Sequence, residues 1–173
     1  MIAPEWGCIA GMQVQEDGVI GLVWLAHDKK VDTLHLYDAL VFEEGDLAIL
    51  AHGINVRGRH IPIAWANKEM ADRLKEEYGC NMLPEAVSEK PEFIEVTSKN
   101  IRERMKTGRF KVDAGQKEWL KEFNEFHRHD AKIPIKAFPL MAATNHAVAG
   151  VKFARRSDTP HVRRSPYPEV SII

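Results

Sequence analysis

Carboxylate side chains are the residues of this sequence that could hold a divalent cation. Glu16 and Asp17 follow a short apolar run at residues 11–14, Asp38 lies within a later apolar run, and Glu69 stands near the start of a predicted helix. Hard oxygen ligands of this kind suit Mg²⁺ or Mn²⁺, which activates water and stabilises a leaving oxygen during hydrolysis. Turns and solvated surfaces commonly carry the same residues, so residue type alone favours a structural role.

The histidine and cysteine residues are weaker indications of a metal site. His127, His129 and Asp130 have the spacing of metal ligands, but a helix C-terminus favours histidine through its dipole without any metal. Cys8 and Cys80 form no CxxC motif and are typical of reduced thiols in a cytoplasmic protein.

Basic residues could contact phosphates or an acidic protein surface. The formal net charge of −1 argues against strong non-specific affinity for nucleic acid over the whole surface, but it allows a local basic patch. A solvated surface remains the alternative. The candidate binding residues are Arg57, Arg59, Lys68, Lys106, Arg109, Lys111, Arg155 and Arg156.

Alternating apolar runs and amphipathic segments predict one α/β domain over residues 1–150, followed by a basic, proline-containing tail over residues 151–173. The apolar runs contain Trp24, Trp65 and Trp119, which we expect in the core. We expect strands at 11–14, 19–25, 31–42, 60–65, 81–84 and 109–112, with 60–65 parallel and central. We expect helices at 43–56 (with acidic residues in its first turn), 67–78, 91–108, 115–129 and 140–149.

No stretch of the sequence is long and apolar enough to span a membrane, and the N-terminus lacks the pattern of a signal peptide. We therefore expect a soluble intracellular protein. The motif GxxxxGK[ST] of nucleotide-binding loops does not occur either.

Three segments resemble the nuclease domain of tailed-phage terminase large subunits. Residues 22–28, Leu-Val-Trp-Leu-Ala-His-Asp, are similar to that family's second strand, and residues 61–65, Ile-Pro-Ile-Ala-Trp, to a later strand. Residues 140–147, Leu-Met-Ala-Ala-Thr-Asn-His-Ala, resemble its last helix. The resemblance covers roughly residues 4–150 and implies a ribonuclease H-like mixed β-sheet flanked by helices.

The resemblance also implies three acidic positions that would hold two divalent metals, and this sequence carries no acid at any of them. Gln13 stands at the first position and Lys68 at the second. Phe138 and Pro139 stand where the last helix would supply carboxylates. An amide oxygen supplies no negative charge and an ammonium group repels a cation, so the replacements imply loss of the metal site.

These replacements predict a catalytically inactive, terminase-nuclease-like phage protein without a cofactor. It would be a binding or regulatory module in viral DNA packaging, located in the host cytoplasm, in contact with a terminase subunit or double-stranded DNA. One alternative is an active Mg- or Mn-dependent DNA endonuclease whose ligands have moved to Glu16, Asp17, Asp38 and Glu69. Another is a structural protein that forms homo-oligomers.

Overall fold

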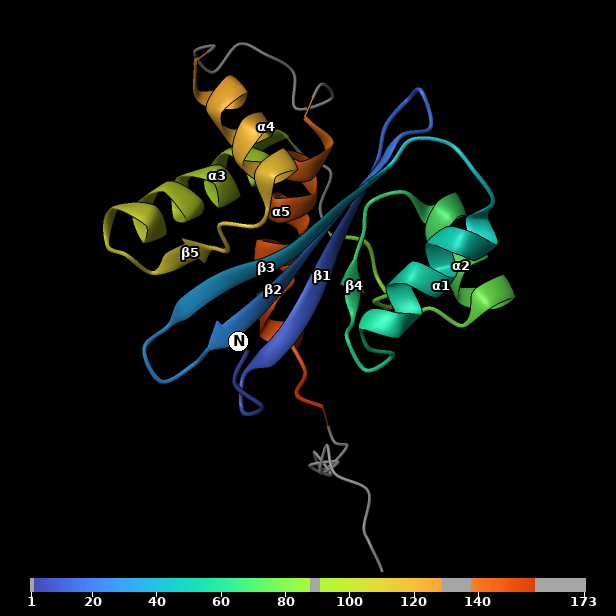
Figure 1. The fold of residues 1–173 in the computed structure, drawn as a ribbon, viewed down its shortest axis with the longest axis horizontal. Coiled ribbons are helices and arrows are strands. Elements are labelled where there is room, and N and C mark those ends of the chain that lie inside the picture. The colour runs from blue at the N-terminus through green and yellow to red at the C-terminus, as the bar shows by residue number, and fades with distance from the viewer. Residues whose placement is uncertain (1, 88–90, 129–137, 158–173) are drawn as a thin grey trace, which may run out of the picture.

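The computed structural model describes residues 2–87, 91–128 and 138–157. In this part of the chain, five strands form one mixed sheet in the order β4-β1-β2-β3-β5 (Figure 1). Strands β1, β2 and β3 form an antiparallel meander, β4 runs parallel to β1, and β5 runs parallel to β3. The strands are β1 Gly7–Val14, β2 Ile20–Asp28, β3 Thr33–Phe42, β4 Ile63–Ala64 and β5 Phe110–Val112.

Five α-helices and one 3₁₀ turn complete the described part. Figure 1 shows α1 and α2 on one side of the sheet, α3 and α4 on the other side, and α5 behind the strands. None of these helices is long and apolar enough to cross a membrane. Their bounds are α1 Leu47–Arg57, α2 Lys68–Tyr78, α3 Pro91–Lys106, α4 Lys117–Arg128, α5 Pro139–Ala149 and η2 Val151–Phe153.

The predicted central strand at residues 60–65 is wrong in position. Only Ile63 and Ala64 pair with β1, and β4 lies at an edge of the sheet, although it is parallel as expected. Met82 forms an isolated bridge with Ile63, and this bridge replaces the strand predicted at 81–84. Pro62 has no N–H group to extend the ladder, which helps to keep β4 short.

Helix α1 begins later than the sequence predicted. Asp46 is its N-cap, and the Asp46 carboxylate accepts a hydrogen bond from the Ala48 N–H at 2.8 Å. Glu43 and Glu44 precede the helix, so its first turn holds no acidic residue, and the Asp46 carboxylate supplies the negative charge at this helix end instead.

The first residues of the predicted tail pack against the sheet. Val151–Phe153 form η2, and Arg155 exchanges backbone hydrogen bonds with Cys8 of β1. The remainder of the tail, residues 158–173, lies outside the described residues.

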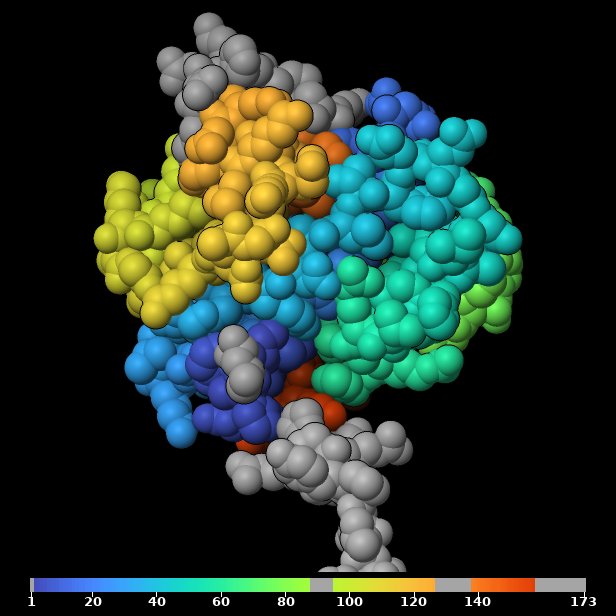
Figure 2. Space-filling model, in the orientation of Figure 1, coloured from blue at the N-terminus to red at the C-terminus, as the bar shows by residue number. Residues whose placement is uncertain are grey.

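Helix α5 is the centre of the hydrophobic core. Every residue from Leu140 to Val148 is buried, as expected for a helix covered on all sides. In the face of the molecule shown in Figure 2, other elements cover most of this helix. The core also contains Trp24, Trp65 and Trp119, which confirms their predicted burial.

Two glycines allow α5 to lie directly on the strands. A Cβ at Gly11 of β1 would stand 2.0 Å from the Ala143 carbonyl oxygen and 2.6 Å from the Ala147 backbone nitrogen. A Cβ at Gly21 of β2 would stand 2.7 Å from the Pro139 carbonyl. Because helix backbone fills this space, any larger residue at either position would push α5 away from the sheet.

We predict that Gly11→Ala destabilises the protein by at least about 3 kcal/mol, because the added methyl group overpacks a rigid backbone contact. The measurement is the free energy of unfolding in urea. Gly53→Ala is the matched control, since a Cβ there meets only the Arg57 side chain at 3.6 Å. The same change at Gly53, in the interior of α1, should stabilise by about 0.5–1 kcal/mol. Similar losses in both variants would contradict the proposed contact.

Candidate functional site

The three positions that the resemblance marks as metal ligands converge at one end of the sheet. Gln13 lies near the end of β1, and Lys68 follows β4, which runs parallel to β1. Gly21 lies opposite Gln13 on β2, and a Cβ at Gly21 would stand 2.7 Å from the Pro139 carbonyl at the start of α5. The fold therefore brings the residues around Gln13, Lys68 and Pro139 to a common region.

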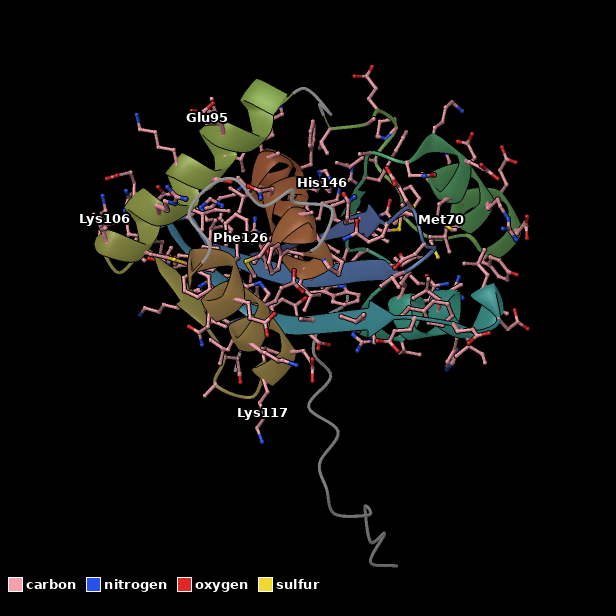
Figure 3. The ribbon with its side chains drawn as sticks, turned by 90° about the horizontal axis from the view of Figure 1, so that it is seen from above. Met70, Glu95, Lys106, Lys117, Phe126 and His146 are labelled. Atoms are coloured by element: carbon pink, nitrogen blue, oxygen red, sulfur yellow. The ribbon has the colours of Figure 1, made fainter. Side chains whose placement is uncertain are left out.

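Gln13 is bound to a buried histidine of α5. His146 Nε2 lies 2.7 Å from Gln13 Oε1, and the Gln13 amide nitrogen donates to the Val14 carbonyl at 3.2 Å. Burial lowers the pKa of His146 to about 4, so this imidazole is neutral at pH 7. With the Gln13 oxygen as acceptor, Nε2 must carry the proton. Figure 3 shows His146 on α5 above the strands.

This hydrogen bond occupies the amide oxygen that could otherwise have faced a cation. The other ring nitrogen of His146, Nδ1, is buried and has no partner among the described residues. A neutral amide–imidazole pair thus stands in the sheet end where a nuclease of this fold would require negative charge.

The other two positions are also unsuited to a metal. The Lys68 ammonium group forms an exposed ion pair with Asp72 one turn along α2, and this carboxylate raises the pKa of Lys68. Phe138 is buried and makes an edge-to-face contact with Phe126, with ring centroids 5.4 Å apart. An amide bound to histidine, a paired ammonium group and a phenyl ring do not fit Mg²⁺ or Mn²⁺, which prefer several carboxylate oxygens.

The four alternative acidic ligands are engaged elsewhere or lie apart. Asp38 forms an ion pair with Arg57 at 2.6 Å, on the sheet face where Arg57 also covers the Trp24 ring. Asp17 accepts a hydrogen bond from the Val19 N–H within the β1–β2 turn, which also contains Glu16. Glu69 belongs to the first turn of α2. Within the described ranges, no three Asp, Glu, His or Cys side chains gather as a metal site would require.

The structure describes only one of the three candidate metal ligands near the end of α4. His127 belongs to α4, whereas His129 and Asp130 lie outside the described residues.

A partly buried carboxylate, not predicted from the sequence, lies at the start of α5. Glu122 of α4 accepts a hydrogen bond from the Met141 N–H at 2.8 Å and so caps α5. Burial raises the pKa of Glu122 to about 7, against the lowering effect of the Met141 and Leu140 N–H groups. Glu122 follows Trp119 by three residues on the apolar face of α4, a spacing that could have revealed an inward acid.

The candidate binding residues divide into paired and unpaired cations. Arg57, Lys68, Lys106 and Arg109 form ion pairs with Asp38, Asp72, Glu103 and Asp32, respectively. Lys111 is exposed on β5. Arg59, Arg155 and Arg156 line a common hollow at the opposite end of β1 from Gln13. The structure therefore separates the predicted basic residues into distinct regions.

Comparisons with solved structures identify the fold. The chain is similar to the nuclease domain of the P22 large terminase, with 20% sequence identity and a TM-score of 0.77 over 90% of this chain and 87% of that one. It is also similar to the large terminase nuclease domain of bacteriophage SPP1, determined with bound Mn. There the identity is 18% and the TM-score 0.60, over 86% of this chain and 84% of that one.

A third similar structure is the large terminase nuclease of thermophilic phage G20c with bound zinc. Its identity is 14% and its TM-score 0.60, over 84% of this chain and 82% of that one. No protein-family model matches the sequence, and no curated protein matches it significantly. The chain thus has the ribonuclease H-like fold of large terminase nuclease domains, as the sequence resemblance implied.

We predict that the burial of His146 makes the protein sensitive to acid. The folded-state pKa of His146, about 4, lies below its ordinary value of 6.5, so unfolding takes up a proton. Stability should be fully present above about pH 6.5 and should fall by up to about 3 kcal/mol towards pH 4. In His146→Gln, which retains an N–H donor without a titrating group, this fall should be absent when urea unfolding is followed against pH.

The matched control for this experiment is His52→Gln, because His52 is exposed on α1. Its stability profile should parallel that of the wild type. An unchanged acid slope in His146→Gln would exclude His146 as the group responsible.

We predict the opposite pH dependence for Glu122. Its folded-state pKa, about 7, lies above the ordinary value of 4.5, so its contribution is fully present below about pH 4.5 and is lost as pH rises through 7. Glu122→Gln keeps an acceptor for the Met141 N–H without the buried charge. It should be more stable than the wild type by about 2 kcal/mol at pH 8 and equal to it near pH 4.5, by thermal or urea unfolding.

Glu125→Gln is the control, because Glu125 is exposed on the same helix. A gain at pH 8 in both variants would indicate a general charge effect along α4, contrary to the prediction.

Proposed function

We propose that this protein is a terminase-nuclease-like binding module of a phage that does not cut DNA by the two-metal mechanism. It acts in viral DNA packaging in the host cytoplasm, where it contacts DNA or a terminase subunit and regulates cleavage or assembly. The observation that carries the proposal is the Gln13–His146 hydrogen bond at 2.7 Å, since it places a neutral pair at the first metal position.

Charge and packing at the same sheet end support the proposal. A two-metal nuclease concentrates negative charge, which neutralises the cations and lets them activate water. Here Lys68 contributes a positive charge, and Phe138 and Pro139 fill the start of α5 with apolar atoms. The scaffold is retained while the charge required for this chemistry is replaced, a combination that favours binding over turnover.

The expected activity is tested with supercoiled plasmid and Mn²⁺. The wild type should neither nick the plasmid nor bind Mn²⁺ stoichiometrically by isothermal titration calorimetry. The triple variant Gln13→Asp, Lys68→Asp, Phe138→Asp should gain Mn²⁺ binding, because it restores carboxylates at all three positions. Circular dichroism establishes that this variant is folded before metal is added.

A control triple variant, Asn124→Asp, Lys121→Asp, Phe153→Asp, makes the same change in net charge at exposed positions. It should not gain Mn²⁺ binding, which separates a restored site from added negative charge. Plasmid nicking by the wild type that a chelator abolishes would refute the proposal and favour the enzyme with relocated ligands.

A further inference from the structure

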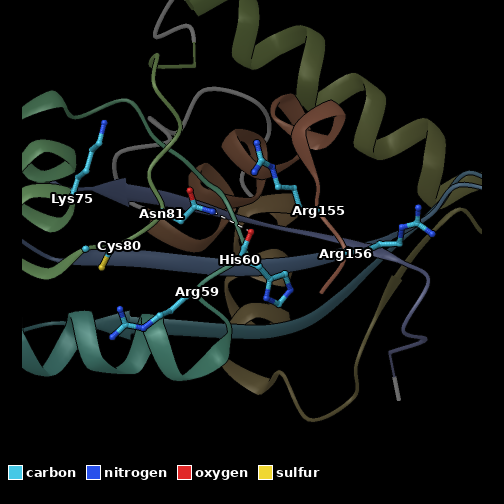
Figure 4. Close-up of a pocket in the computed structure, with 8 residues that line it drawn as sticks. Arg59, His60, Lys75, Cys80, Asn81, Arg155 and Arg156 are labelled. Carbon is cyan, nitrogen blue, oxygen red and sulfur yellow. Dashed lines mark hydrogen bonds between the residues drawn. The ribbon is translucent and has the colours of Figure 1, made fainter. Parts of the chain in front are cut away.

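An open hollow of about 660 Å³ lies at the end of the sheet opposite Gln13. Three separate segments line it: the chain after α1, the end of α2 with the residues that follow, and the chain after η2 (Figure 4). Cationic and polar side chains dominate the lining, namely Arg59, His60, Lys75, Asn81, Arg155 and Arg156.

The four cationic side chains of this hollow are free to interact with an anion. Arg59, Lys75, Arg155 and Arg156 are all exposed, and none forms an ion pair or side-chain hydrogen bond with any described residue. By contrast, Arg57, Arg73, Arg104 and Arg109 are held by carboxylates; Arg104 and Arg109 both bind Asp32. Four cationic side chains thus line one hollow without an ion pair to any described side chain.

The helix ends nearby reduce this charge only in part. Helices α1 and α2 both end beside the hollow, and each C-terminus contributes roughly half a negative charge. Four cations against about one negative charge from the helix ends leave the lining of the hollow net positive. The Cys80 thiol adds no negative charge, because burial raises its pKa in spite of the nearby Arg59 guanidinium.

The hollow is built into the fold at a fixed place. Asn81 donates a hydrogen bond to the His60 carbonyl at 3.1 Å and so joins the segments that follow α1 and α2. Arg155 is held by backbone hydrogen bonds with Cys8 at 2.8 and 2.9 Å. Cys8 and Gln13 are five residues apart on β1, which corresponds to about 16 Å along a strand. The hollow is therefore distinct from the site at Gln13.

We propose that this hollow, lined by Arg59, Lys75, Arg155 and Arg156, is a binding site for the phosphates of a polynucleotide backbone. The inference rests on the binding role proposed above and assigns that role to a surface remote from the former metal positions. Guanidinium groups bind phosphate oxygens in pairs, and cations from three segments can follow successive phosphates.

The lining favours phosphates over an acidic peptide. Protein interfaces take most of their affinity from buried apolar and aromatic anchors, whereas phosphate backbones require only charge and hydrogen bonds. Among the described residues, the lining contains no large apolar side chain, and its two remaining members, Gly79 and Cys80, are small.

The test is fluorescence anisotropy of a labelled DNA duplex of about 20 base pairs, titrated with the full chain in EDTA over a range of NaCl concentrations. The wild type should bind with strong salt dependence. Arg59→Glu, Arg155→Glu should weaken binding by roughly 10-fold and reduce the slope of log K against log salt by about 2, since each phosphate contact contributes about 0.9. The milder double variant Arg59→Gln, Arg155→Gln should also weaken binding. It replaces the charge-reversal variant if that variant does not fold.

The matched control is Lys117→Glu, Lys121→Glu, which changes the net charge equally at exposed positions of α4 and should bind as the wild type does. Wild-type affinity in both hollow variants, or an equal loss in the control, would overturn the inference. Tighter binding of a mononucleotide or of poly-glutamate than of the duplex would also overturn it. Nicking in Mn²⁺ would refute only the proposed function, because the binding measurement excludes metal.

Discussion

The direct contact between α5 and the first two strands is the constraint on which the rest of the structure depends. Gly11 and Gly21 remove the side chains that would separate them, so helix backbone lies against strand backbone. A helix in this position has no face towards solvent, and its residues from Leu140 to Val148 are all buried. Every polar group that α5 carries must therefore find a partner inside the protein or remain uncharged.

The polar residues of α5 follow this rule in detail. Thr144 accepts a hydrogen bond from the Trp119 indole and donates to the Leu140 carbonyl, while Asn145 donates to Met141 and accepts from Ser98. His146 is neutral and bound to Gln13. The carboxylates that a two-metal nuclease needs would be costly at the start of this helix without a cation, because burial of an uncompensated charge is unfavourable.

Glu122 illustrates the same cost. It is the carboxylate that reaches the start of α5, and burial raises its pKa to about 7 even though two N–H groups bind it. At the start of α5, the buried Phe138 ring packs against Phe126, which stabilises this region without any buried charge. The neutral Gln13–His146 pair and the apolar Phe138 contact thus both avoid a buried, uncompensated charge in this region.

The sequence allowed much of the fold to be predicted but little of the side-chain pairing. Periodicity located all five described α-helices, with ends that shifted by a few residues, and the resemblance supplied the mixed topology. The edge position of β4 was missed because Ile61–Trp65 is a buried apolar run, and such a run is equally typical of a central strand. Gln13 was located by its position along β1, but its partner is 133 residues away and follows only from the packing of α5.

The division of the basic residues depends on similarly distant contacts. Arg57 and Arg59 are neighbours in the sequence and equivalent by composition, yet Arg57 reaches Asp38 across 19 residues whereas Arg59 faces an open hollow. A charge that is already paired contributes little to attracting a phosphate, since its field is largely cancelled at short range. The partners of the arginines, more than their number, therefore determine where this nearly neutral protein can attract an anion. Three arginines without an ion pair among the described residues, Arg59, Arg155 and Arg156, line the hollow at the opposite end of β1 from Gln13.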